Sequence, residues 1–257
     1  MRLRKVAPSL FALSLLAAPC LATEPAPSGA TQPPAATVDA GAIQALREMG
    51  ACLMKLSRFQ VQTSVTGERV LEDGQKLQRS AVAELQVQRP NKLRALMSSA
   101  GGERELIYDG KSATLYTPAL KYYGSTEAAD TIGGMIRQLE EKFGIDVPLV
   151  DLFMWGTDAA PIDTIESALY AGQDLVGKKL CDHYAFRQPG IDWQIWIATG
   201  DQPLPQKLVI TSRGDEARPQ STSLLTWNLK PTFKDTVFAF KAPRDATRIS
   251  IRPLSEK

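Results

Sequence analysis

Cys181, Asp182 and His183 are consecutive residues whose side-chain types suit nucleophilic catalysis. On a strand, alternate residues point to the same face, so Cys181 and His183 would share a face. Asp182 would then point away from the imidazole that a catalytic triad requires it to orient. We therefore interpret His183 as a structural, hydrogen-bonding histidine. We predict that the protein is not an enzyme and has no catalytic residues.

Metal and cofactor sites have little support in the sequence. The chain has one His and three Cys, and its carboxylates show none of the usual metal-ligand spacings. Glu140 and Glu141 are adjacent on a predicted helix and would face apart. The pairs Gly101-Gly102 and Gly133-Gly134 lack the frame of a phosphate-binding loop. We predict no metal and no cofactor.

Export is predicted by the first 22 residues. Arg2, Arg4 and Lys5 precede an apolar run at 10–18, and Cys20-Leu21-Ala22 fits a cleavage site after Ala22. The run is too short to span a bilayer, so we expect a periplasmic protein with no transmembrane segment in the mature chain. The alternative, lipidation of Cys20, is disfavoured by Pro19, where lipoprotein processing requires a small residue.

Composition and charge narrow the class of partner. The chain has 257 residues, of which 44% are hydrophobic and 23% charged, as in folded domains. Cleavage after Ala22 would remove three of the 30 basic residues and none of the 28 acidic ones, which leaves a net charge of −1. A nearly neutral protein lacks the basic face that nucleic acid requires. We therefore predict no nucleic-acid partner.

The remaining chain divides into a tether and one domain. Residues 23–38 are rich in Pro and Ala and predict a disordered tether. A helix should begin after Asp39, because apolar residues follow at spacings of three and four. They are Ile43, Leu46, Met49, Leu53 and Leu56. The single domain is predicted to span 39–257.

Most of this domain alternates with a period of two, which is typical of antiparallel strands. Phe59, Val61, Thr63 and Val65 begin this pattern. A helix at 132–143, a shorter apolar segment at 147–155 and a further helical turn at 162–169 interrupt it. Strands then resume, the last ones at 237–240 and 248–251. We predict an α+β fold: a single curved antiparallel sheet of about ten strands, an incomplete barrel covered on its concave face by helices.

Two cysteines remain in the predicted mature chain. Cys52 lies on the first predicted helix, beside its apolar stripe, and Cys181 lies on a strand. A disulfide would require their Cα atoms to lie within roughly 7 Å. We predict two free thiols.

Apolar residues on the inward-facing side of the strands have two interpretations. They form an ordinary core, or some of them line a pocket for an apolar ligand. Trp193 and Trp196 are three residues apart and must face opposite ways, and we assign Trp193 to the pocket. The predicted ligand-binding residues are Phe59, Val61, Leu85, Leu93, Met97, Leu106, Tyr108, Trp193, Ile195 and Trp227.

Four runs of the sequence are distinctive: Arg89-Pro90-Asn91-Lys92-Leu93-Arg94, Tyr108-Asp109-Gly110-Lys111, the run from Leu180 to Ile197, and the run from Leu204 to Thr211. They resemble an uncharacterised family of predicted periplasmic bacterial proteins of the DUF2092 type. The resemblance extends from about Ile43 to Ile251. The family has no assigned activity to transfer.

More distantly, the order of elements resembles the LolA/LolB-like lipoprotein-carrier superfamily. The chain shares its N-terminal helix, its strand meander with an Arg-Pro-Asn break, its helical lids and a closing Phe238, Phe240 and Pro243. This resemblance implies a LolA-like half-barrel whose apolar cavity holds acyl chains. The arginine that latches the lid in those carriers has three candidates here, Arg69, Arg79 and Arg89.

These observations predict a periplasmic, non-catalytic carrier or sensor. Its partner would be an apolar ligand, either a lipid or a lipoprotein acyl chain, held in the hollow of the half-barrel. The alternative is an envelope protein–protein interaction or signalling module without a small-molecule ligand. It would bind its partner through a sheet edge or the lid helices.

Overall fold

The computed structural model of the protein describes residues 37–145, 147 and 149–254. The signal peptide, the cleavage after Ala22, the lipidation alternative at Cys20 and most of the predicted tether fall outside these residues. In the described part of the chain, no helix is both long enough and apolar enough to cross a membrane.

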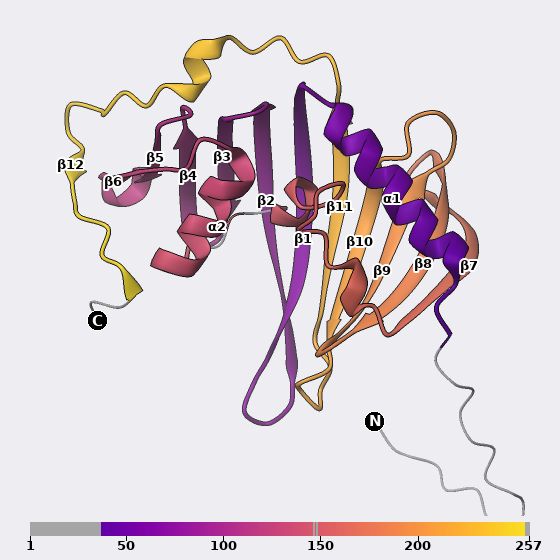
Figure 1. The fold of residues 1–257 in the computed structure, drawn as a ribbon. Coiled ribbons are helices and arrows are strands. Elements are labelled where there is room, and N and C mark those ends of the chain that lie inside the picture. The colour runs from indigo at the N-terminus through magenta and orange to yellow at the C-terminus, as the bar shows by residue number, and fades with distance from the viewer. Residues whose placement is uncertain (1–36, 146, 148, 255–257) are drawn as a thin grey trace, which may run out of the picture. The chain divides into compact units, whose positions relative to one another are not determined.

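The described residues form one large, curved, unclosed sheet of twelve strands (Figure 1). All neighbouring strands are antiparallel except β12 and β6. The two edge strands, β12 and β7, do not pair with each other, so the sheet is not closed. The order across the sheet is β12-β6-β5-β4-β3-β2-β1-β11-β10-β9-β8-β7. The strands are β1 (Arg58–Val70), β2 (Lys76–Gln88), β3 (Lys92–Ser99), β4 (Gly102–Tyr108), β5 (Ser112–Thr117), β6 (Tyr122–Glu127), β7 (Ser167–Val176), β8 (Lys179–Gln188), β9 (Ile191–Ala198), β10 (Pro205–Ser212), β11 (Gln220–Asn228) and β12 (Thr247–Arg248).

Two α-helices have end signals that are visible in the sequence. α1 (Ala40–Lys55) begins where the Asp39 carboxylate accepts a hydrogen bond from the Gly41 N–H, at 2.7 Å. α2 (Ile132–Phe143) ends at Gly144, whose φ of 64° is one that glycine adopts without strain. The short 3₁₀ helices are η1 (Pro118–Leu120), η2 (Val150–Phe153), η3 (Ile162–Thr164) and η4 (Asp235–Phe238).

Four details differ from the sequence-based expectations. The strand expected at 248–251 is the two-residue β12, Thr247–Arg248, which pairs parallel to β6. The sheet has twelve strands rather than about ten. The predicted helical turn at 162–169 ends at Thr164, and β7 then begins at Ser167 and pairs with β8. The spacing of Leu169 is misleading because its side chain is 48% exposed and belongs to no buried stripe. Residues 235–238 form a 3₁₀ helix where a strand at 237–240 was expected, although Phe238 is buried as an inward-facing residue would be.

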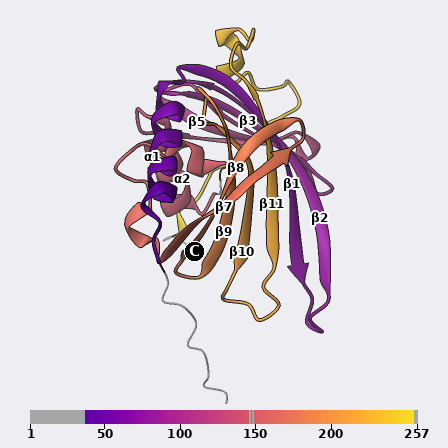
Figure 2. The same ribbon diagram turned by 90° about the vertical axis from the view of Figure 1, so that its right-hand side faces the viewer.

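Both helices lie against the same face of the sheet, here called the inner face (Figures 1 and 2). Their buried side chains and those of the inner face form one continuous apolar cluster, which includes Leu46, Met49, Leu85, Leu93 and Leu139. The opposite, outer face carries a smaller cluster of Cys181, Trp196 and Val209. The strands are therefore buried mainly on the side that faces the helices.

Candidate ligand-binding site

The inner face is not completely filled. A cavity of about 160 Å³, here called the inner cavity, lies between β8–β11, α1 and residues 149–161, which we call the lid segment. Gln188 is the one polar side chain among the described residues that line it, and none of them is charged. The lining residues are Met49, Leu149, Leu152, Trp155, Pro161, Gln188, Ile191, Trp193, Ile195, Pro205, Leu208, Ile210 and Leu225.

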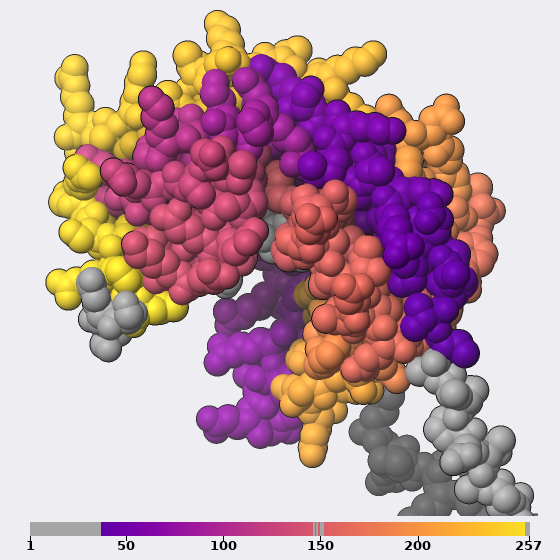
Figure 3. Space-filling model, in the orientation of Figure 1, coloured from indigo at the N-terminus to yellow at the C-terminus, as the bar shows by residue number. Residues whose placement is uncertain are grey.

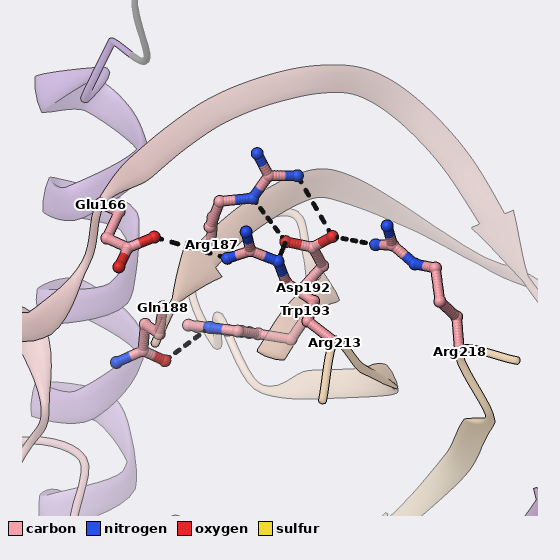
Figure 4. Close-up of polar contacts among 7 residues, drawn as sticks. All are labelled: Glu166, Arg187, Gln188, Asp192, Trp193, Arg213 and Arg218. Atoms are coloured by element: carbon pink, nitrogen blue, oxygen red, sulfur yellow. Dashed lines mark hydrogen bonds and ion pairs between the residues drawn. The ribbon is translucent and has the colours of Figure 1, made fainter. Parts of the chain in front are cut away.

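Gln188 connects the lid segment to the floor of the inner cavity. Its Nε2 donates to the Pro161 carbonyl oxygen at 2.9 Å and to Thr164 Oγ1 at 2.6 Å. Its Oε1 accepts from Trp193 Nε1 at 2.7 Å (Figure 4). Since the Gln188 side chain is buried, these bonds satisfy the polar atoms of its own amide.

Trp193 is held from two sides by other aromatic rings. Phe186, its antiparallel partner on β8, stacks on it with ring centroids 4.3 Å apart. Trp155 of the lid segment packs against it with centroids 5.9 Å apart. The lid segment thus covers the inner cavity with an aromatic side chain directed at the cavity floor.

Glycines bring the lid segment against α1. A Cβ on Gly50 would lie 2.5 Å from the backbone nitrogen of Gly156, and a Cβ on Gly156 would lie 2.5 Å from the carbonyl oxygen of Gly50. Gly156 also has a φ of +84°. Helix and segment therefore touch backbone to backbone at this point, which only glycine permits. Figure 3 shows the lid segment beside α1 on this face.

On the outer face, behind Trp193, the neighbouring Asp192 joins three arginines (Figure 4). Arg187 binds its carboxylate through two nitrogens, at 2.7 and 3.2 Å, and Arg218 binds it at 2.5 Å. Arg213 lies 3.8 Å from Asp192 and 3.5 Å from Glu166. The hydrogen bond from Arg187 and the nearby positive charges lower the pKa of the Asp192 carboxyl. These ion pairs hold the β8–β9 turn, from which Gln188 and Trp193 extend inward.

The structure places two of the predicted ligand-binding residues, Trp193 and Ile195, in the wall of the inner cavity. The other predicted residues belong to the inner-face core and do not line this cavity. Six of them are buried, namely Phe59, Val61, Leu85, Leu93, Leu106 and Tyr108, while Met97 and Trp227 are half-buried. Trp196 faces the outer cluster, opposite to Trp193, as strand geometry predicts.

Gln188, Trp155 and Gly50 contribute to the site but are absent from the sequence-based prediction. Only Gly50 had a signal in the sequence, because a glycine within an otherwise regular amphipathic helix often marks close packing. Gln188 precedes a Pro-Gly turn and has no pattern that distinguishes it from a surface residue. Of the three candidate latch arginines, Arg89 lies beside α2 and the lid segment, while Arg69 and Arg79 lie on β1 and β2 in the long hairpin.

The Cys181-Asp182-His183 run is not arranged as a triad. Asp182 accepts hydrogen bonds from Tyr170 Oη and Gln173 Nε2, both at 3.2 Å. His183 stacks on Trp196 with centroids 4.0 Å apart, and its Nε2 lies 3.0 Å from Gln194 Oε1. His183 therefore has the structural, hydrogen-bonding position that was predicted.

Both cysteines of the described chain are free. Cys52 packs against the inner-face core and Cys181 belongs to the outer cluster. Burial raises the pKa of both thiols, which disfavours the nucleophilic thiolate. Among the described residues, no group of three or more His, Cys, Asp or Glu side chains is placed to bind a metal ion.

Several solved structures are similar to the chain at low sequence identity. An uncharacterized conserved protein from Thermus thermophilus has 11% identity and a TM-score of 0.48, and the match covers 82% of this chain and 99% of that one. The lipoprotein LppX of Mycobacterium tuberculosis has 12% identity and a TM-score of 0.48, over 76% of this chain and 98% of that one. A LolA superfamily protein from Nitrosomonas europaea has 7% identity and a TM-score of 0.37, over 77% and 97%.

Sequence comparison identifies the family. No curated protein matches the chain. A family model described as "Predicted periplasmic protein (DUF2092)" matches residues 42–252. This description confirms the predicted periplasmic location. Because the match spans most of the chain, the protein belongs to the DUF2092 family of predicted periplasmic proteins.

Proposed function

We propose that the protein is a non-catalytic periplasmic carrier or sensor that holds an apolar ligand, a lipid or a lipoprotein acyl chain, in the inner cavity. The observation that carries this proposal is the lining of that cavity, in which Gln188 is the one polar side chain among the described residues. Ligand pockets are typically apolar with a small number of placed polar groups. An apolar chain would gain free energy from burial there.

The size of the inner cavity adds a requirement to this proposal. Its volume of about 160 Å³ is below the roughly 300–1,000 Å³ of typical ligand pockets. A long acyl chain therefore requires the lid segment to move away from the sheet. Trp155 must move with the lid segment, because its ring packs against Trp193 where the ligand would bind.

Two neighbouring leucines on β11 provide a matched test. Leu225 lines the inner cavity, while the side chain of Leu224 is 46% exposed on the other face. Leu225→Phe places a larger side chain in the cavity and leaves less room for a ligand. It should weaken binding of a fluorescent long-chain fatty acid at least fivefold. Leu224→Phe should leave binding unchanged. Saturable binding that is equally sensitive, or equally insensitive, to both substitutions would place the ligand elsewhere.

A second candidate function, docking of an envelope protein, is favoured by the edge strand β7. Leu169, Tyr170 and Leu175 are exposed there by 48%, 45% and 64%. Residues 37–39 already pair with Ala168 at the start of this strand, so only the rest of the edge could offer unpaired backbone groups to a partner. Native mass spectrometry of protein purified from its own host separates the two candidates. A co-purified lipid supports the carrier. A protein that co-purifies with the wild type but not with Leu175→Lys supports docking.

A further inference from the structure

A second cavity lies on the other side of the lid segment. This α2 cavity, of about 390 Å³, lies between α1, the N-terminal half of α2, and the lid segment. Phe153, Met154 and Thr157 of the lid segment line it, while Leu152 and Trp155 line the inner cavity. The lid segment is therefore a wall shared by the two cavities, and its displacement would join them.

Arg89 lines the α2 cavity and is half-buried. Its Nε and Nη2 atoms are buried and make no hydrogen bond to any residue that the structure describes. Its guanidinium lies over the Phe153 ring, 5.6 Å from the centroid. Among the side chains that the structure describes, no carboxylate lies within 4.0 Å of it. A buried charge without a counter-charge is costly, so Arg89 is positioned to gain from an added anion.

The start of α2 contributes to the same cavity. Ile132, Gly133 and Gly134 of the first turn of this twelve-residue helix line the α2 cavity, together with the N-cap residue Thr131. A helix N-terminus carries partial positive charge from its backbone N–H groups. The Ile132 N–H donates to the Pro90 carbonyl oxygen and the Gly134 N–H donates to Thr131 Oγ1, both at 3.1 Å. A Cβ on Gly133 would meet open space. The helix end therefore adds only a partial positive charge beside the Arg89 guanidinium.

The other charged residues of the α2 cavity are Arg137 and Glu140. Arg137 is exposed on α2 and adds a solvated positive charge. Glu140 is half-buried and adds one negative charge to the lining. The lining therefore carries two positive side chains, Arg89 and Arg137, and one negative one.

We infer that the ligand is an amphipathic anion, in which an acidic headgroup on a single apolar chain binds Arg89 in the α2 cavity and the chain extends under the lid segment. This inference rests on the proposed function and specifies its ligand class. A guanidinium binds carboxylate and phosphate groups alike through paired N–H donors. A free fatty acid and a phosphate-headed single-chain lipid therefore share the required chemistry.

Three probes with the same twelve-carbon chain test the inference by isothermal titration calorimetry. Dodecanoate and dodecyl phosphate carry an acidic headgroup, and dodecanol does not. We expect the full chain to bind one or both anions at least tenfold more tightly than dodecanol, a difference of about 1.4 kcal/mol. The tighter of the two anions identifies the headgroup source.

Substitutions assign the preference to Arg89. Arg89→Met should reduce the anion preference to threefold or less while leaving dodecanol binding intact, and its ligand-free melting temperature should not fall, because a buried charge is removed. Arg79→Met removes an exposed hairpin arginine and should retain the full preference. If Arg89→Met does not fold, Arg89→Lys decides, because loss of the paired donors should still lower the preference at least threefold.

The outcomes separate this inference from the proposed function. If dodecanol binds as tightly as the anions, the carrier proposal stands and the role of Arg89 is wrong. If Arg89→Met, or Arg89→Lys in its place, keeps the full preference, the headgroup binds elsewhere and the inference is wrong. If none of the three probes binds, the carrier proposal itself fails.

Discussion

At the scale of single residues, Gln188 joins the cover of the inner cavity to its floor. Three hydrogen bonds meet at its side-chain amide, and all of their partners are protein groups. Removing one partner of a buried hydrogen bond leaves the other with its full desolvation cost. The stability of the closed site should therefore depend strongly on this one amide.

Gln188→Leu keeps the approximate size of the side chain and removes all three bonds. We expect the free energy of unfolding to fall by about 1–3 kcal/mol, measured by urea denaturation. Trp193→Phe removes the indole donor together with part of a buried ring, so its cost combines a lost hydrogen bond with lost packing. In the Gln188→Leu protein, Trp193→Phe should lower the free energy of unfolding by less than it does in the wild type, because the acceptor of its hydrogen bond is already gone. Additive effects of the two substitutions would contradict this coupling.

Tyr108 provides a prediction about alkaline pH. Burial, with the Asp130 and Asp109 carboxylates nearby, raises the pKa of its phenol to about 12, above the ordinary value of about 10. Its hydroxyl donates to the Ala129 carbonyl oxygen at 2.6 Å. A raised pKa in the folded state contributes stability that is complete below pH 10 and is lost as the pH rises toward 12.

We therefore expect the melting temperature of the protein to fall between pH 10 and 12, and to fall less in Tyr108→Phe. Part of the decrease should remain in that variant, because burial also raises the pKa of Tyr184 to about 12. Thermal melts at closely spaced pH values measure the difference. Identical pH profiles for the two proteins would show that Tyr108 titrates normally.

At the scale of elements, the contact between α1 and the lid segment depends on Gly50 and Gly156. Alanine is favoured over glycine within a helix by roughly 1 kcal/mol, so propensity alone predicts that Gly50→Ala stabilises the protein. The geometry predicts the opposite, because the new Cβ would lie 2.5 Å from a backbone nitrogen of the lid segment. Backbone cannot yield as a flexible side chain does.

Gly50→Ala should therefore lower the free energy of unfolding by about 1–3 kcal/mol and expose the lid segment to chymotrypsin at Phe153 and Trp155. Gly133→Ala on α2 is the matched control, because a Cβ there meets open space. It should be neutral or stabilising in the same urea titration. A Gly50→Ala protein as stable and protease-resistant as the control would show that the lid segment adapts easily.

At the scale of the whole molecule, processing of the chain decides whether it can move as a carrier. A mature protein that begins at Thr23 without lipid could travel through the periplasm, whereas a lipid on Cys20 would anchor it. We predict cleavage after Ala22 and no lipid, because Pro19 occupies a position that lipoprotein processing reserves for small residues. The intact mass of the exported protein measures this, and a diacylglyceryl mass would make it an anchored protein.

Much of the fold was predictable from the sequence because it is encoded in local periodicity. Spacings of three and four identified α1 and α2, and alternation of apolar and polar residues identified most strands of the sheet. Asp39 and Gly144 marked helix ends through their own side-chain and backbone chemistry. The predictions of a helical turn at 162–169 and of a strand at 237–240 were wrong. The residues of such short segments fit both helical spacing and strand alternation, and tertiary pairing decides between the two.

The candidate site was predictable only in part. Alternation gave the inward direction of Trp193 and Ile195, because the side chains of a strand must alternate. Whether an inward-facing residue borders a cavity or packed atoms depends on what lies across from it, so Phe59 and Leu85 could not be distinguished from Trp193 in sequence. The path of the lid segment over the sheet joins Trp155 to Trp193, Gly50 to Gly156 and Phe153 to Arg89. The sequence by itself thus determined the elements and their inward faces, whereas only the tertiary structure determined the cavities, since a cavity is defined by contacts between segments far apart in the chain.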